Sequence, residues 1–160
     1  MAPATPLGKG GVSVVRVSGV GAKAVGEVVC GELNRPWVFK KCQIKNKKGV
    51  VVDSGLVVLF ESPKSYTGED VVEVHCHGSP VVVDLVVESF LGEGCRLAEP
   101  GEFTKRAYLN EKIDMTQAEA VSDLIASETE EAARAAHNSL VGEFSKLVNG
   151  VIERVGSVRV

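Results

Sequence analysis

The hydrophobic and polar positions of this chain change their spacing along its length, from the period of strands to that of helices. Alternation with a period of two predicts β-strands over residues 12–18, 37–45, 50–60 and 71–76. The turn residues at 46–49 predict that the second and third of these strands form a hairpin. Apolar positions three and four residues apart predict helices over residues 22–29, 80–91 and 100–108, and only helical spacing remains from residue 115 onward.

The helix over residues 80–91 has a clear start. Ser79 has the residue type of an N-cap, and Pro80 that of the first helical position. The helical spacing predicts that its buried face consists of Val83, Val87, Phe90 and Leu91.

Two further helices are predicted after residue 115. Thr116 with Glu119, and Ser127 with Glu130, have the spacing of capping boxes, so we expect a helix to begin at each pair. The second helix is predicted to run unbroken to the end of the chain, with an apolar seam at Leu140, Phe144, Leu147, Val151, Val155 and Val158. One short preceding helix covers little of this seam. Beyond Gly142 we therefore expect the helix either to fray or to pair with another copy or with a further part of the protein.

Charged side chains interrupt two of the apolar strands. In the strand over residues 71–76, Glu73 and His75 lie on the face opposite three apolar side chains, and Arg16 interrupts the strand over residues 12–18. A charge in such a strand is costly to bury unless it is paired. These two charges of opposite sign therefore indicate a paired or ligand-binding polar site. The alternative is that both side chains lie on a solvated face of the sheet.

The composition restricts the class of protein. The chain of 160 residues has a net charge of −3, which gives no reason to expect this segment alone to bind nucleic acid strongly. Its 4 cysteines are not spaced as Cys-x-x-Cys, and it has neither an apolar signal core nor an apolar run of membrane-helix length. We therefore expect reduced thiols in a cytoplasmic protein with no membrane association. A basic patch on the predicted hairpin is interpreted as protection of a sheet edge rather than as an RNA contact, and consists of Lys40, Lys41, Lys45, Lys47 and Lys48.

Two motifs suggest other kinds of site. Lys9, within the glycine-rich run at residues 8–11, invites comparison with a phosphate-binding loop, but no Ser or Thr follows it and a strand, not a helix, comes next. We expect a turn there, and no GTPase activity from this segment. His75, Cys76 and His77 suggest a zinc hydrolase, but adjacent strand residues point to opposite faces and a catalytic zinc needs three protein ligands. We therefore expect no metal site and assign no catalytic residue.

Three stretches of the chain resemble the N-terminal part of the MnmE (TrmE) family of tRNA-modification GTPases. They are ATPLGKGGVSVVRVSG at the start, SPKSYTGEDVVEVHCHGSP in the middle, and AEPGEFTKRAYLNEKIDMTQAEAVSDLI before the Ala-rich helix. The resemblance covers nearly the whole chain, least well between residues 20 and 55. Leu7 stands where the family often has proline, and Ser79 where it often has glycine; neither position carries a charge.

The resemblance implies an α+β fold. We expect a mixed β-sheet domain packed with helices and related to tetrahydrofolate-binding folds, followed by a C-terminal helical segment. The first would be a folate-binding and dimerisation domain over residues 1–114, and the second the truncated beginning of a helical domain over residues 115–160. In the family, a GTPase domain that uses GTP, magnesium and potassium is inserted into the helical domain, and the chain ends in a short cysteine-containing motif. Neither sequence is present in this chain.

The family's positions for a one-carbon folate match Arg16, Glu73 and Lys112 of this sequence. A carboxylate can accept hydrogen bonds from the adjacent amino group and ring N–H of a pterin, and the two cations suit the anionic tail or a formyl carbonyl. The implied ligand is 5-formyl- or 5,10-methylene-tetrahydrofolate. The resemblance also implies a homodimer that modifies the wobble uridine (U34) of tRNA together with the FAD-dependent partner MnmG. The alternatives are a structural dimerisation domain without a ligand, and the zinc hydrolase.

Overall fold

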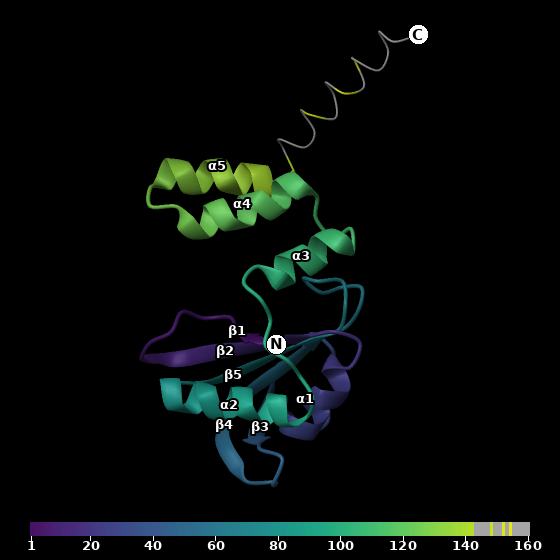
Figure 1. Ribbon diagram of the computed structural model, residues 1–160, viewed down its shortest axis with the longest axis vertical. Helices are drawn as coiled ribbons and strands as arrows, with labels where there is room; N and C mark the ends of the chain where they lie inside the picture. The colour runs from purple at the N-terminus through teal and green to yellow at the C-terminus, as the bar shows by residue number, and fades with distance from the viewer. Residues whose placement is uncertain (143–147, 149–151, 153, 155–160) are drawn as a thin grey trace. The chain divides into compact units, whose positions relative to one another are not determined.

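The computed structural model describes residues 1–142 together with residues 148, 152 and 154. The chain divides into two compact units, Met1–Phe103 and Thr104–Val160 (Figure 1). The domain boundary predicted after residue 114 concerns the domains of the family and stays a prediction. Within the described residues, no helix is long and apolar enough to cross a membrane.

The first unit is built on a five-stranded sheet. Its strands are β1 (Ala2–Pro3), β2 (Gly10–Ser18), β3 (Lys40–Lys45), β4 (Val51–Phe60) and β5 (Val71–Gly78), in the order β1-β2-β5-β4-β3. The α+β class and the β3–β4 hairpin are confirmed. Every pairing among these strands is antiparallel, which replaces the mixed sheet of the prediction. Tight connections such as the β3–β4 hairpin join only antiparallel neighbours.

The strand predicted over residues 37–45 begins later, at Lys40. Trp37 has a φ of 66°, a left-handed conformation that does not occur within a regular strand. Its indole meets the ring of Phe60 edge-on, with 4.9 Å between the ring centroids. The chain before β3 therefore turns and packs against the end of β4.

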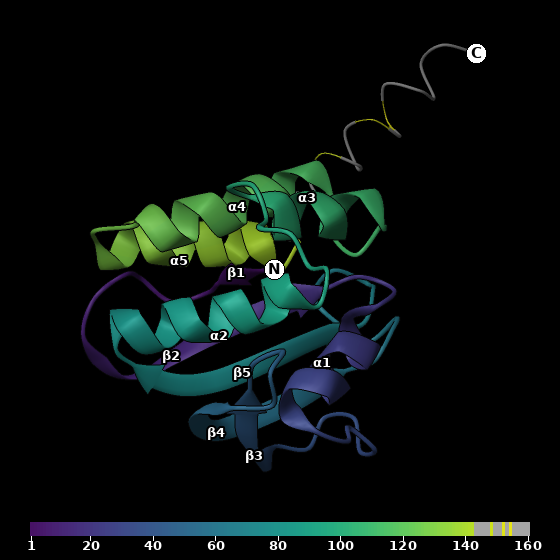
Figure 2. The ribbon, with the colours of Figure 1, turned by 60° about the horizontal axis from the view of Figure 1, so that its bottom comes forward.

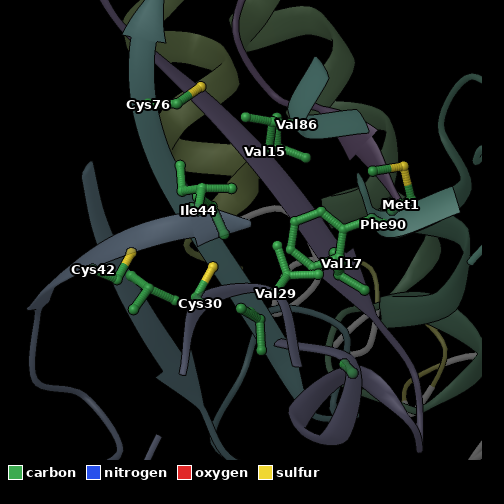
Figure 3. Packing of buried hydrophobic residues seen from close by; sticks show 14 of the residues in the cluster. Met1, Val15, Val17, Val29, Cys30, Cys42, Ile44, Cys76, Val86 and Phe90 are labelled. Atoms are coloured by element: carbon green, nitrogen blue, oxygen red, sulfur yellow. The ribbon is translucent and has the colours of Figure 1, made fainter. Parts of the chain in front are cut away.

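Helices α1 (Ala22–Cys30) and α2 (Pro80–Gly92) cover one face of this sheet (Figure 2). The core lies between these helices and the sheet, and includes Val15 of β2, Ile44 of β3 and Phe90 of α2 (Figure 3). All three side chains are fully buried. Most apolar positions of the strands therefore point to this covered face, although Val58 and Val71, which alternate with core residues, are buried as well.

The start of α2 is as predicted, with Ser79 as the N-cap and proline in the first turn. Its buried face is correct at Val83 and Phe90, but Leu91 is 37% exposed. Val86, which the prediction omitted, is fully buried instead. It lies three residues after Val83 and four before Phe90, so it belongs to the same apolar stripe.

The four cysteines are free thiols, as expected. Cys30 of α1 and Cys42 of β3 lie near each other in the core (Figure 3). The hydrogen bond between their side chains, together with burial, raises the pKa of Cys30, and the same hydrogen bond lowers the pKa of Cys42.

The second unit contains α4 (Met115–Ala126) and α5 (Glu130–Leu140), which pack against each other, and α3 (Glu102–Leu109) crosses the boundary between the units. The N-cap of α4 is Asp114, so the prediction of Thr116 is wrong. The Asp114 carboxylate accepts the N–H of Gln117 at 2.8 Å, and the Gln117 side-chain oxygen accepts the N–H of Asp114 at 3.0 Å. This is a complete capping box, formed two residues earlier than the predicted one.

The N-cap predicted at Ser127 is also wrong, because α5 is capped by Thr129. The Thr129 hydroxyl accepts the N–H of Ala132 at 3.2 Å. The Ser127 hydroxyl instead donates to the carbonyl of Leu124 at 2.8 Å, at the end of the preceding helix. Ser127 therefore closes one helix rather than opening the next.

The unbroken helix predicted after residue 127 is wrong as well. Helix α5 ends at Leu140, and Gly142 has a φ of 84°, the left-handed conformation that commonly ends helices. The side-chain amide of Gln117 donates to the carbonyl of Leu140 at 2.8 Å and so satisfies one of the last acceptors of α5. The rest of the predicted seam, and its fraying or pairing, lie outside the described residues.

Candidate functional site

The candidate site lies on the sheet face opposite α1 and α2. Strand β5 runs between β2 and β4, so each of its residues has a neighbour on both sides. The register places Glu73 between Arg16 of β2 and Val58 of β4. Two charges that are far apart in the sequence therefore become direct cross-strand neighbours.

Arg16 and Glu73 form an ion pair across the sheet. Arg16 Nε donates to Glu73 Oε1 at 2.7 Å, and the side chains are 28% and 15% exposed. The predicted pairing of these charges is therefore confirmed, and the alternative of two separately solvated side chains is not. Such a half-buried, charge-assisted hydrogen bond is stronger than one between neutral groups.

Two aromatic rings flank the guanidinium group of Arg16. Its Cζ lies 5.6 Å from the ring centroid of Tyr66 and 5.7 Å from that of Phe103, both within the range of cation–π attraction. These aromatic neighbours were not predicted from the sequence. Tyr66 stands in the same polar stretch as Glu73, which was a usable signal, whereas nothing in the sequence linked Phe103 to Arg16.

Side-chain hydrogen bonds attach the loop between β4 and β5 to the end of β2. The hydroxyl oxygens of Ser18 and Thr67 are 2.6 Å apart, and the Ser18 hydroxyl donates to Glu69 Oε2 at 2.8 Å. Thr67 is fully buried. Because this loop carries Tyr66, these hydrogen bonds hold the aromatic ring beside Arg16.

Lys112, the third predicted residue, lies in the second unit, in the turn after α3. Its backbone N–H donates to the carbonyl of Ala107 at 2.9 Å, and the preceding Glu111 has a φ of 56°. Arg16 and Glu73 both belong to the first unit. The structure thus brings two of the three predicted residues together, and the role of Lys112 stays a prediction.

The zinc alternative can be compared with the contacts that the residues of β5 make in the structure. His77 has its Nδ1 2.8 Å from Asp53 Oδ1, and its backbone N–H donates to Asp53 Oδ2 at 2.9 Å. Burial acts to raise the pKa of Asp53, but the hydrogen bonds from His77 and from the backbone of Ser54, together with the charge of His77, hold the pKa below its usual value. Cys76 points into the core, where burial raises the pKa of its thiol. In the part of the chain that the structure describes, no three His, Cys, Asp or Glu side chains are grouped to hold a metal ion.

The surface of the first unit is hollowed near Phe39 and near His75. One hollow of about 320 Å³ is lined by residues that include Val38 and Phe39, and another of about 210 Å³ by residues that include His75. Neither hollow is lined by Arg16 or Glu73.

Comparison with known proteins adds to this geometry. A family model described as "GTP-binding protein TrmE N-terminus" matches residues 1–112. Two curated proteins named "tRNA modification GTPase MnmE", from Neisseria meningitidis serogroup C / serotype 2a and serogroup A / serotype 4A, are each 46% identical to this chain over 158 residues. The alignments cover 99% of this chain but 35% of each relative, so the chain spans about a third of their length.

Proposed function

Because the chain belongs to the TrmE N-terminal family, we propose that it is the folate-binding and dimerisation module of a GTPase that modifies the wobble uridine (U34) of tRNA. Its ligand is 5-formyl- or 5,10-methylene-tetrahydrofolate, which supplies the carbon unit. The residues that bind this ligand are Arg16, Glu73 and Lys112.

The observation that carries the proposal is the half-buried carboxylate of Glu73, held by Arg16 on the sheet face opposite α1 and α2. A pterin carries an amino group and a ring N–H side by side, and a carboxylate can accept both hydrogen bonds with its two oxygens. Oε1 of Glu73 accepts one hydrogen bond from Arg16, and a carboxylate oxygen has two acceptor positions. The carboxylate therefore retains enough acceptor capacity for the ligand.

The cations suit the other parts of a reduced folate. Arg16 uses only its Nε toward Glu73, so the Nη groups can donate to a formyl carbonyl or to a carboxylate of the glutamate tail. The flanking rings of Tyr66 and Phe103 add flat apolar surface beside the guanidinium. In the proposal, Lys112 supplies a second positive charge for the same anionic tail.

The proposed module also acts as a homodimer. Small-molecule sites are concave and bury most of the surface of their ligand. A second copy facing Arg16 and Glu73 would enclose the ligand by the two-fold contact common in homodimers. In the whole protein, a G domain would bind GTP with magnesium and potassium. The FAD-dependent MnmG would be the partner, tRNA the substrate, and the cytoplasm the location.

Calorimetric titration of the purified chain with 5-formyl-tetrahydrofolate tests the proposal. Wild-type protein should bind, and Glu73→Ala should weaken binding by about 2–5 kcal/mol, the range for truncating one partner of a buried charged contact. This corresponds to a rise in Kd of about 30-fold to several thousand-fold.

Glu61→Ala is the matched control. Glu61 is also a glutamate of the first unit, but its side chain is 53% exposed and its contact with Lys23 spans 4.0 Å. Its removal should leave Kd unchanged. Glu73→Gln keeps the shape of the side chain, and circular dichroism of each variant separates loss of binding from loss of folding. Equal binding by wild type and Glu73→Ala, or no binding by wild type, would overturn the assignment.

A further inference from the structure

His75 lies next to Glu73 on the face of β5 opposite α1 and α2. The register places it between Val14 of β2 and Leu56 of β4, and the ring of Phe39 meets its imidazole edge-on with 5.1 Å between centroids. Its Nε2 atom is buried and has no hydrogen-bond partner in the described part of the chain. A buried polar atom without a partner is costly, and in native proteins it requires an explanation.

The explanation lies in the neighbouring carboxylate. Nε2 of His75 is 3.7 Å from Oε2 of Glu73, about 0.5 Å beyond the range of a hydrogen bond. The other oxygen, Oε1, is already held by Arg16 at 2.7 Å. One oxygen of the carboxylate is thus fixed, while a potential donor stands beside the other. Polar contacts at functional sites often tighten when a ligand binds.

We propose that His75 is a positioning residue, which donates its Nε2–H to Oε2 of Glu73 and so fixes the plane of the carboxylate. This inference rests on the proposed folate-binding function. A carboxylate has about four acceptor positions, two on each oxygen. Arg16 takes one position on Oε1 and His75 one on Oε2, which leaves one on each oxygen. These two remaining positions match the adjacent amino group and ring N–H of a pterin.

The orientation needs a second anchor because a carboxylate held at one oxygen can still rotate about its Cγ–Cδ bond. Rotation would move Oε2 out of line with the ligand and lose one of the two hydrogen bonds. The apolar neighbours of His75 restrict its imidazole and leave it no competing partner among the described residues. His75 therefore acts through Glu73, without contact with the ligand.

The test is a set of calorimetric titrations with 5-formyl-tetrahydrofolate. His75→Leu should raise Kd about tenfold to a hundredfold, which corresponds to the loss of one hydrogen bond to a charged group. His75→Gln retains an N–H donor and should restore Kd to within about threefold of wild type. In the Glu73→Gln background, His75→Leu should have little further effect on Kd. The reason is that His75 acts through the carboxylate of Glu73, which this background already lacks.

His77→Gln is the matched control. His77 lies on the same face of the same strand, but its imidazole is 69% exposed and paired with Asp53. The Kd of the His77→Gln variant should stay within about threefold of wild type, the same limit as for His75→Gln. A nitrogen-15 NMR spectrum of the unliganded protein provides a second measurement, since Nε2 of His75 must carry a hydrogen at neutral pH.

The outcomes distinguish the positioning role of His75 from the proposed folate-binding function. If His75→Leu binds like wild type while Glu73→Gln does not, the positioning role is wrong and the folate site stands. The positioning role is also wrong if Nε2 carries no hydrogen, or if His75→Leu weakens binding equally with and without Glu73. If wild-type protein does not bind the folate at all, the proposed function fails and this inference with it.

Discussion

Gly55 lies where β4 passes close to the backbone of β5. A Cβ built at this position would be 2.0 Å from the carbonyl oxygen of His75, and real Cβ atoms essentially never approach another heavy atom within 3.0 Å. Because the obstacle is backbone, no side-chain rotation relieves the contact. Gly55→Ala must therefore push the two strands apart by about 1 Å.

The free-energy cost of separating the two strands follows from the backbone hydrogen bonds between them. Opening the ladder beside the Leu56–His75 pair would break about two backbone hydrogen bonds, at about 1 kcal/mol each. Forcing extra volume into a packed region costs a further 1–3 kcal/mol or so. We therefore expect Gly55→Ala to lower the free energy of unfolding by about 3–5 kcal/mol, a large part of the roughly 5–15 kcal/mol of a typical domain.

Urea unfolding followed by circular dichroism measures this loss. Gly11→Ala is the matched control, because Gly11 is also a strand glycine but a Cβ there would meet nothing within 4 Å. It should change the free energy of unfolding by no more than about 0.5 kcal/mol. A loss below about 1 kcal/mol for Gly55→Ala, with an unchanged denaturant slope, would refute the reasoning about the close approach.

Two further predictions concern a carboxylate and a cap. The pKa of Asp53 is depressed in the folded protein, so Asp53 stabilises the fold above its unfolded-state pKa and this contribution is lost as the pH falls below about 4. Asp53→Asn should therefore flatten the acid limb of the stability-against-pH curve, and an acid limb identical to that of wild type would contradict this. Asp114→Ala should lower stability by about 1 kcal/mol and Thr116→Ala should not. Equal losses in thermal unfolding would argue against the cap at Asp114.

Much of the first unit could be predicted from sequence, because its strands alternate clearly. The alternation along β5 separated Glu73 and His75 from the apolar side chains, and the same pattern in β2 identified Arg16. Opposite charges on two strands then indicated the pair. The sequence alone could not show that these strands are neighbours in the sheet, because that depends on the order β1-β2-β5-β4-β3.

The errors have local physical causes. Both N-caps in the second unit were misassigned because several Ser, Thr and Asp residues near each helix have suitable spacing, and only the backbone geometry decides between them. The end of α5 before Gly142 was not predicted, because the apolar seam continues past this residue, while glycine permits a left-handed turn. Phe103 could not be assigned to the site, because its approach to Arg16 depends on how the start of a helix packs.

The two faces of strand β5 carry side chains with different roles. Val72 and Val74 are fully buried beneath the helices and must satisfy packing, whereas Glu73 and His75 lie outside that core. Successive residues of this strand are thus constrained alternately by core packing and by polar contacts. Substitutions at positions 73 and 75 can therefore alter the polar side chains of β5 without removing a side chain from the core beneath α1 and α2. For protein engineering, this strand is a place where a new specificity can be introduced at alternate residues without redesign of the scaffold.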